Sequence, residues 1–96
     1  MRTIVLDGEQ MTDRGQTHDY LAERLALPDF YGRNLDALHD CLSEIAQPTR
    51  LVLYRIAAIV ERLGPYGLTL LRVLRESARQ NPLLVIVLNH GETWPE

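Results

Sequence analysis

The sequence predicts one α/β domain, built on a three-stranded parallel sheet with about four helices. Three short runs rich in Leu, Ile and Val, at residues 2–6, 50–54 and 83–88, alternate with stretches whose apolar residues recur at steps of three and four. Strands separated by helices require crossover connections, which join parallel strands. The 96 residues leave room for one core. We therefore expect a single domain at 1–88 and a C-terminal tail at 89–96.

Turn and capping residues mark the ends of the first strand and the start of the first helix. Residues 2–6 form an apolar, β-branched run that is closed by Asp7 and Gly8, a turn pair. Asp13 precedes Gln16 by three residues in a capping-box pattern, and Leu21 and Leu25 follow at helical spacing. These features predict a helix that ends near Leu25.

A loop and a second helix are expected next. Pro28 forbids further helix, so residues 28–33 form a loop, and Asn34 suits the N-cap of the following helix. An amphipathic stripe then recurs at steps of three and four, comprising Leu35, Leu38, Leu42 and Ile45. This stripe predicts a helix with one buried face, ending before Pro48.

The second half repeats the strand and helix alternation. Residues 50–54 predict a strand, 56–63 a short helix and 66–79 a longer one, which Asn81 and Pro82 end. The continuous apolar run at 83–88 is typical of a strand buried on both faces, lying centrally or between helices. The tail is expected to be loose, apart from Trp94 folding back onto the domain.

Charge and composition narrow the classes of function. Residues 1–48 hold nine acids against four arginines, a net of −5, whereas residues 49–96 hold four acids against six arginines, a net of +2. This asymmetry favours a basic partner and argues against nucleic acid.

No apolar segment is long enough to cross a bilayer, and Asp7 comes too early for a signal peptide, so we expect a cytoplasmic protein with no membrane partner. Cys41, the single cysteine, allows no internal disulfide and is interpreted as a small apolar helix residue.

Three acidic residues form a row on the second predicted helix. Asp36, Asp40 and Glu44 stand at i, i+4 and i+8, opposite the apolar stripe, and no basic residue lies at helical spacing within this helix to relieve their repulsion. The row is either a solvated face or a surface that binds a basic pocket. His39 lies on its flank, so Asp36, His39 and Asp40 also raise the alternative of a metal or acid–base site. No metal-binding, phosphate-binding or nucleophile motif accompanies them, so no cofactor, metal or catalytic residue is expected.

One segment resembles a known family. Residues 27–42 carry the pattern Tyr-Gly-x-Asn-Leu-Asp-Ala-Leu-x-Asp-Cys-Leu, which is similar to the signature stretch of barstar. The resemblance extends to Asp7-Gly8-Glu9-Gln10 after the first strand, to the second strand, to residues 72–76 and to the closing apolar strand. It covers nearly the whole chain up to Leu88.

The resemblance implies an intracellular inhibitor that binds a barnase-type secreted ribonuclease in a 1:1 complex and is monomeric when free. It implies that Asp40 takes the place of a substrate phosphate, that Asp36 pairs with a second basic site and that Glu76 adds an outer acidic contact. The complete set of expected partner-binding residues is Phe30, Tyr31, Asn34, Leu35, Asp36, His39, Asp40, Ser43, Glu44 and Glu76.

Four positions depart from the barstar pattern. Phe30 replaces a Tyr, His39 and Ile45 each replace a Trp, and Glu44 replaces a Gly. Because aromatic residues commonly anchor interfaces, these departures leave the identity of the target open. The alternatives are a barstar-like immunity or regulatory protein that binds a different nuclease toxin or another basic protein, and catalysis.

Overall fold

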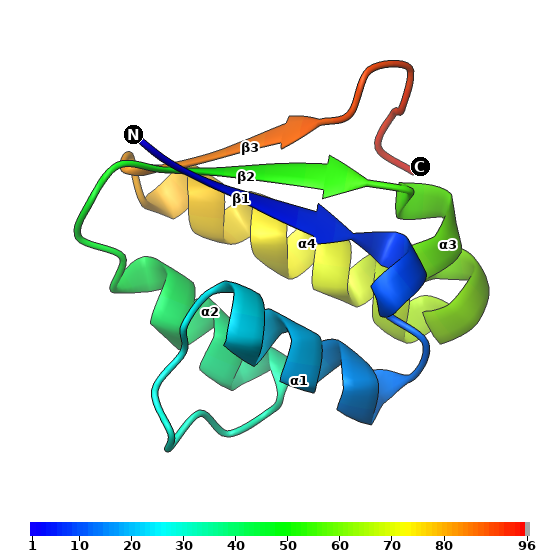
Figure 1. The fold of residues 1–96 in the computed structure, drawn as a ribbon, viewed down its shortest axis with the longest axis horizontal. Helices are drawn as coiled ribbons and strands as arrows, with labels where there is room; N and C mark the ends of the chain where they lie inside the picture. The colour runs from blue at the N-terminus through cyan, green and yellow to red at the C-terminus, as the bar shows by residue number, and fades with distance from the viewer. Residues whose placement is uncertain (96) are drawn as a thin grey trace.

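The computed structural model describes residues 1–95 and confirms the predicted order of elements (Figure 1). Each strand and helix lies within a few residues of its expected position. The elements are β1 (Arg2–Asp7), a short 3₁₀ helix η1 (Gly8–Gln10), α1 (Arg14–Arg24), α2 (Leu35–Ser43), β2 (Thr49–Tyr54), α3 (Ile56–Leu63), α4 (Pro65–Gln80) and β3 (Leu84–Leu88).

The three strands form one parallel sheet in the order β1-β2-β3. Ile4 of β1 is in register with Leu51 of β2, and Leu51 is in register with Ile86 of β3. The expected three-stranded parallel sheet is therefore confirmed. β2 is the central strand, and β3 is an edge strand.

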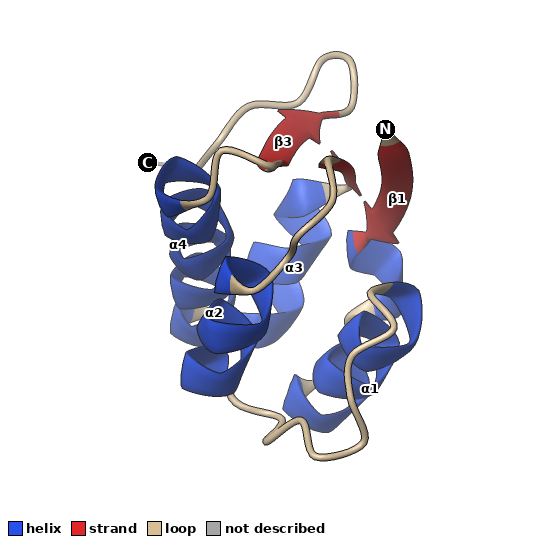
Figure 2. Ribbon diagram, turned by 90° about the vertical axis from the view of Figure 1, so that its left-hand side faces the viewer, coloured by secondary structure: helices blue, strands red, loops and turns tan. Residues whose placement is uncertain are grey.

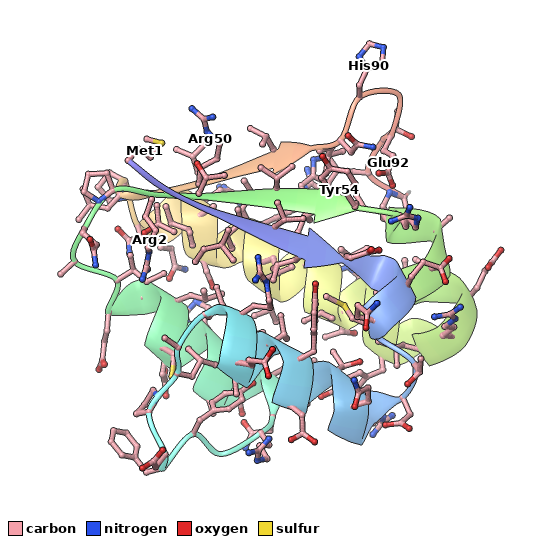
Figure 3. All side chains as sticks on the ribbon, viewed as in Figure 1. Met1, Arg2, Arg50, Tyr54, His90 and Glu92 are labelled. Carbon is pink, nitrogen blue, oxygen red and sulfur yellow. The ribbon has the colours of Figure 1, made fainter. Side chains whose placement is uncertain are left out.

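All four helices lie on one side of the sheet, and the other side faces solvent (Figure 2). Val85 and Val87 of β3 are 41% and 37% exposed, while Leu84 of the same strand is buried. Arg50 also stands on this open face (Figure 3). The expectation that residues 83–88 are buried on both faces was therefore wrong. A continuous apolar run cannot distinguish a doubly covered strand from an edge strand whose outer face carries valines.

The core lies between the covered face of the sheet and the helices. β1, β2 and the four α-helices contribute fully buried side chains: Leu6, Leu21, Leu38, Leu42, Leu51, Leu53, Ile59, Leu70 and Leu74. β3 adds Leu84, which is 2% exposed. α3 and α4 approach each other closely at Gly67, where a Cβ atom would lie 2.6 Å from the carbonyl oxygen of Ile59. A side chain at this position would force the two helices apart.

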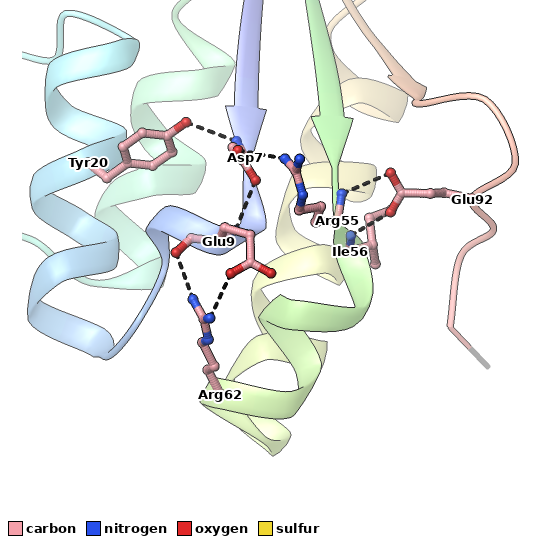
Figure 4. Close-up of polar contacts among 7 residues, drawn as sticks. All are labelled: Asp7, Glu9, Tyr20, Arg55, Ile56, Arg62 and Glu92. Atoms are coloured by element: carbon pink, nitrogen blue, oxygen red, sulfur yellow. Dashed lines mark hydrogen bonds and ion pairs between the residues drawn. The ribbon is translucent and has the colours of Figure 1, made fainter.

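Polar contacts join the carboxyl ends of β1 and β2 to the helices (Figure 4). The Tyr20 hydroxyl accepts a hydrogen bond from the backbone N–H of Asp7, and Arg55 Nη1 lies 2.8 Å from Asp7 Oδ2. Arg62 donates to the backbone oxygen and to the carboxylate of Glu9. These contacts fix α1 and α3 against the ends of the strands.

Residues 89–95 contact the domain through Glu92 and Trp94, whereas a loose segment was expected. The Glu92 carboxylate accepts hydrogen bonds from the backbone N–H groups of Arg55 and Ile56, at 2.8 and 2.6 Å, and so caps α3, which has no side-chain cap of its own (Figure 4). The expected return of Trp94 is confirmed, because its ring packs against the core and the guanidinium carbon of Arg75 lies 4.7 Å from the ring centroid. Within residues 1–95, no helix is both long enough and apolar enough to cross a membrane.

Candidate protein-binding face

The N-terminus of α2 is capped as the sequence predicted. Asn34 Oδ1 accepts a hydrogen bond from the backbone N–H of Ala37 at 2.8 Å, and the Asn34 side-chain amide donates to the carbonyl of Gly32. Leu38 and Leu42 are fully buried. Because both the cap and the packing of these leucines are fixed, the rotation of α2 about its axis is also fixed.

This rotation places the acidic row in solvent. Asp36, Asp40 and Glu44 are all exposed. α2 ends at Ser43, so Glu44 is the C-cap residue and Ile45 lies just beyond the helix, half-buried. The row therefore extends from the first turn of α2 to its C-cap residue.

No basic group forms an ion pair with the row within the part of the chain that the structure describes. The four ion pairs there join other residues: Arg33 to Asp19, Arg55 to Asp7, Arg62 to Glu9, and Arg79 to Glu76. The described residues also contain no cluster of His, Cys, Asp and Glu side chains that could hold a metal ion, so Asp36, His39 and Asp40 do not form one. The exposed carboxylates of the row can therefore bind a cationic surface.

An apolar groove lies beside the row, between the loop that follows α1 and the C-terminal half of α2. Its volume is about 710 Å³, and Leu27, Phe30 and Ile45 contribute to its apolar lining. Asp40 and Glu44 also line it. Phe30 is 87% exposed, which is unusual for an aromatic side chain that has no partner to cover it. Carboxylates and an exposed aromatic ring therefore share one surface.

The remaining expected site residues differ in how accessible they are. Leu35 and His39 are half-buried on α2, and the Ser43 hydroxyl is exposed but donates back to the carbonyl of His39. Glu76 is exposed on α4, which packs beside α2 (Figure 2). Its carboxylate accepts hydrogen bonds from Arg79 and Gln80.

Tyr31 is the exception among the expected contact residues. It is only 7% exposed, and its hydroxyl oxygen lies 2.6 Å from Nδ1 of His18. Its side chain packs in the core and also lines the groove beside Asp40. The expected direct contact of Tyr31 with a partner therefore stays a prediction, and only the small exposed part of this side chain could make it. A Tyr beside a Phe in a loop gives no sequence signal of which ring turns inward.

His18 belongs to the support of this face and was not among the expected site residues. It is 2% exposed, and its Nε2 lies 2.6 Å from the hydroxyl of Tyr66. Burial lowers the pKa of His18, the positive charge of Arg33 lowers it further and Asp19 opposes the shift. Burial also raises the pKa of the Tyr31 phenol, which stays protonated. One feature of the sequence could have indicated the burial of His18. It directly follows Thr17, which also lies on the buried side of α1.

Comparison with known proteins assigns this arrangement to a family. Residues 1–89 match the family model described as Barstar (barnase inhibitor). The chain belongs to the barstar family. It is also 40% identical, over 81 residues, to the protein named "Putative ribonuclease inhibitor YrdF" from Bacillus subtilis strain 168, an alignment that covers 83% of this chain and 89% of that relative. The resemblance drawn from residues 27–42 is thereby confirmed, and the barstar family is one of inhibitors, not of enzymes.

Proposed function

We propose that the chain inhibits a secreted ribonuclease of the barnase type by inserting α2 and the preceding loop into the active site of the enzyme. The observation that supports this most directly is the acidic row. Asp36, Asp40 and Glu44 are exposed on one rigidly held segment, and none of them forms an ion pair among residues 1–95.

The physical reason is complementarity of charge. A ribonuclease active site binds phosphate with cationic groups, and the same groups can bind carboxylates held at phosphate positions. Asp40 is central in the row, so its carboxylate takes the most enclosed position in the proposed complex. Phe30 and the adjoining groove supply apolar contact beside the charges, as interface anchors commonly do.

The same row supports the remaining parts of the proposal. Two copies of this face repel each other, so the free protein is a monomer and binds one enzyme molecule. Its place of action is the cytoplasm of the producing cell, where it meets the ribonuclease before export.

The departures at His39 and Ile45 favour a second candidate function. This is immunity toward a different nuclease toxin that is bound by the same face.

An inhibition assay tests the proposal. RNA cleavage by barnase, and by a panel of secreted ribonucleases of that type, is measured while the protein is titrated in. We expect one enzyme of the panel to lose activity at one equivalent of inhibitor. Asp40→Ala should abolish this inhibition at the same concentration, whereas Glu61→Ala, an exposed acid on α3, should leave it unchanged.

The opposite results identify the alternatives. If no ribonuclease of the panel is inhibited, the ribonuclease proposal fails, and inhibition of a nuclease of another type would support the immunity role. RNA cleavage or other turnover by the purified chain would contradict both.

A further inference from the structure

A second pocket lies on the other side of the start of α2. It occupies about 400 Å³ between the first turns of α1 and α2. Arg14, Arg33 and Tyr66 contribute to its lining, and so does Asp36 of the acidic row. Any partner that covers Asp36 therefore also meets this pocket.

Arg14 is held in place in the pocket without an acidic partner. Its guanidinium carbon lies 4.2 Å from the centroid of the Tyr66 ring, and the Tyr66 hydroxyl is itself fixed by Nε2 of His18 at 2.6 Å. A guanidinium that lies over an aromatic ring retains its N–H donors for another group. Within residues 1–95, Arg14 forms no ion pair, whereas Arg33 on the opposite wall pairs with Asp19.

A cation at this position is unfavourable for the proposed partner unless a negative charge meets it. An enzyme with a cationic cleft repels a basic residue placed at the edge of the interface, and like charges brought together there weaken binding. A second copy of this chain is a poor occupant as well, because Asp36 of each copy would approach the other. The pocket therefore fits a carboxylate group that lies next to a basic group on the partner.

We propose that this pocket binds an aspartate or glutamate side chain of the target ribonuclease, with Arg14 as the principal donor and Arg33 as the second. This inference rests on the proposed function and specifies the target further. The target carries an acidic residue beside the basic group that Asp36 binds, and a ribonuclease without that acid is bound less tightly.

Reversing the charge of Arg14 tests this proposal, because the two explanations predict opposite changes in binding affinity. If Arg14 only adds positive charge to the inhibitor, Arg14→Glu should tighten binding to a cationic ribonuclease and should speed association. If Arg14 binds a carboxylate, the same change places two acids together and should weaken binding about tenfold or more. Arg14→Gln, which removes the charge at similar length, should weaken binding by a smaller factor.

The measurement is the dissociation constant with the ribonuclease that the unchanged protein inhibits most strongly in the panel above. Arg50→Glu is the matched control, because Arg50 is exposed on the open face of the sheet, away from the helices (Figure 3). It should leave binding unchanged or slightly tighter. Thermal unfolding of each variant shows whether the fold is intact.

The outcomes separate the two proposals. Weaker binding by Arg14→Glu and by Arg14→Gln, with Arg50→Glu at or below the original dissociation constant, supports the carboxylate pocket. Tighter or unchanged binding by Arg14→Glu overturns it, while the Asp40-dependent inhibition would still stand. If no ribonuclease is inhibited by the unchanged protein, the proposed function fails and this inference fails with it.

Discussion

Nδ1 of His18 lies 2.6 Å from the hydroxyl oxygen of Tyr31. The other ring nitrogen faces the hydroxyl of Tyr66, so a single imidazole joins α1, the loop before α2, and α4. This loop carries Phe30 and leads into the acidic row. The geometry of the binding face therefore depends on a buried histidine.

The stability of the protein should depend on the protonation of His18. Burial lowers the pKa of His18 below its ordinary value of 6.5, so the folded state binds fewer protons than the unfolded state. The stabilisation is complete above the unfolded pKa and is lost as the pH falls below it. We expect the free energy of unfolding, measured in urea, to fall between about pH 7 and pH 5.

A substitution identifies the group responsible for this pH dependence. His18→Gln should be less stable at pH 7 and should show a flatter dependence of stability on pH in the same range. A slope as steep as that of the unchanged protein would assign the dependence to another group.

Removing the Tyr31 hydroxyl should destabilise the fold. Tyr31→Phe leaves a buried ring nitrogen of His18 without a partner, and an unsatisfied buried polar group costs about 1–3 kcal/mol. The matched control is Tyr54→Phe, since the half-buried Tyr54 hydroxyl makes no hydrogen bond within the described chain. Equal free energies of unfolding for the two variants would contradict the role given to Tyr31.

The tail should contribute to stability through Glu92. Glu92→Ala removes the carboxylate that caps α3, and the loss of a cap costs about 0.5–2 kcal/mol. Thr93→Ala, at the exposed neighbouring residue, should have little effect in the same denaturation experiment. A fully stable Glu92→Ala variant would show that α3 does not need this cap.

Much of the fold could be predicted because local signals and global topology agree. Asn34 marks the start of α2, and the periodicity of Leu38 and Leu42 orients the acidic row toward solvent. The sequence alone therefore predicts that Asp36 and Asp40 are exposed.

Other features depend on contacts between residues distant in the sequence. The cap that Glu92 provides spans 37 residues to Arg55, and the contact of His18 with Tyr66 spans 48. Neither contact produces a pattern in the local sequence that could predict it. The exposure of Val85 and Val87 depends on how many faces of the sheet are covered, which the composition of one strand does not determine.

The central claim is that Asp40 takes the place of a phosphate among the basic groups of the ribonuclease. The most direct test compares the dissociation constants of Asp40→Ala and Glu76→Ala with the same inhibited enzyme. Asp40→Ala should cost roughly 3–5 kcal/mol of binding free energy, because it leaves enclosed cations without a partner. Glu76→Ala should cost only about 1 kcal/mol, because an exposed pair is screened by solvent. Both variants should unfold at the same temperature as the unchanged protein, since both side chains are exposed. Equal losses for the two variants, or full inhibition by Asp40→Ala, would contradict the account.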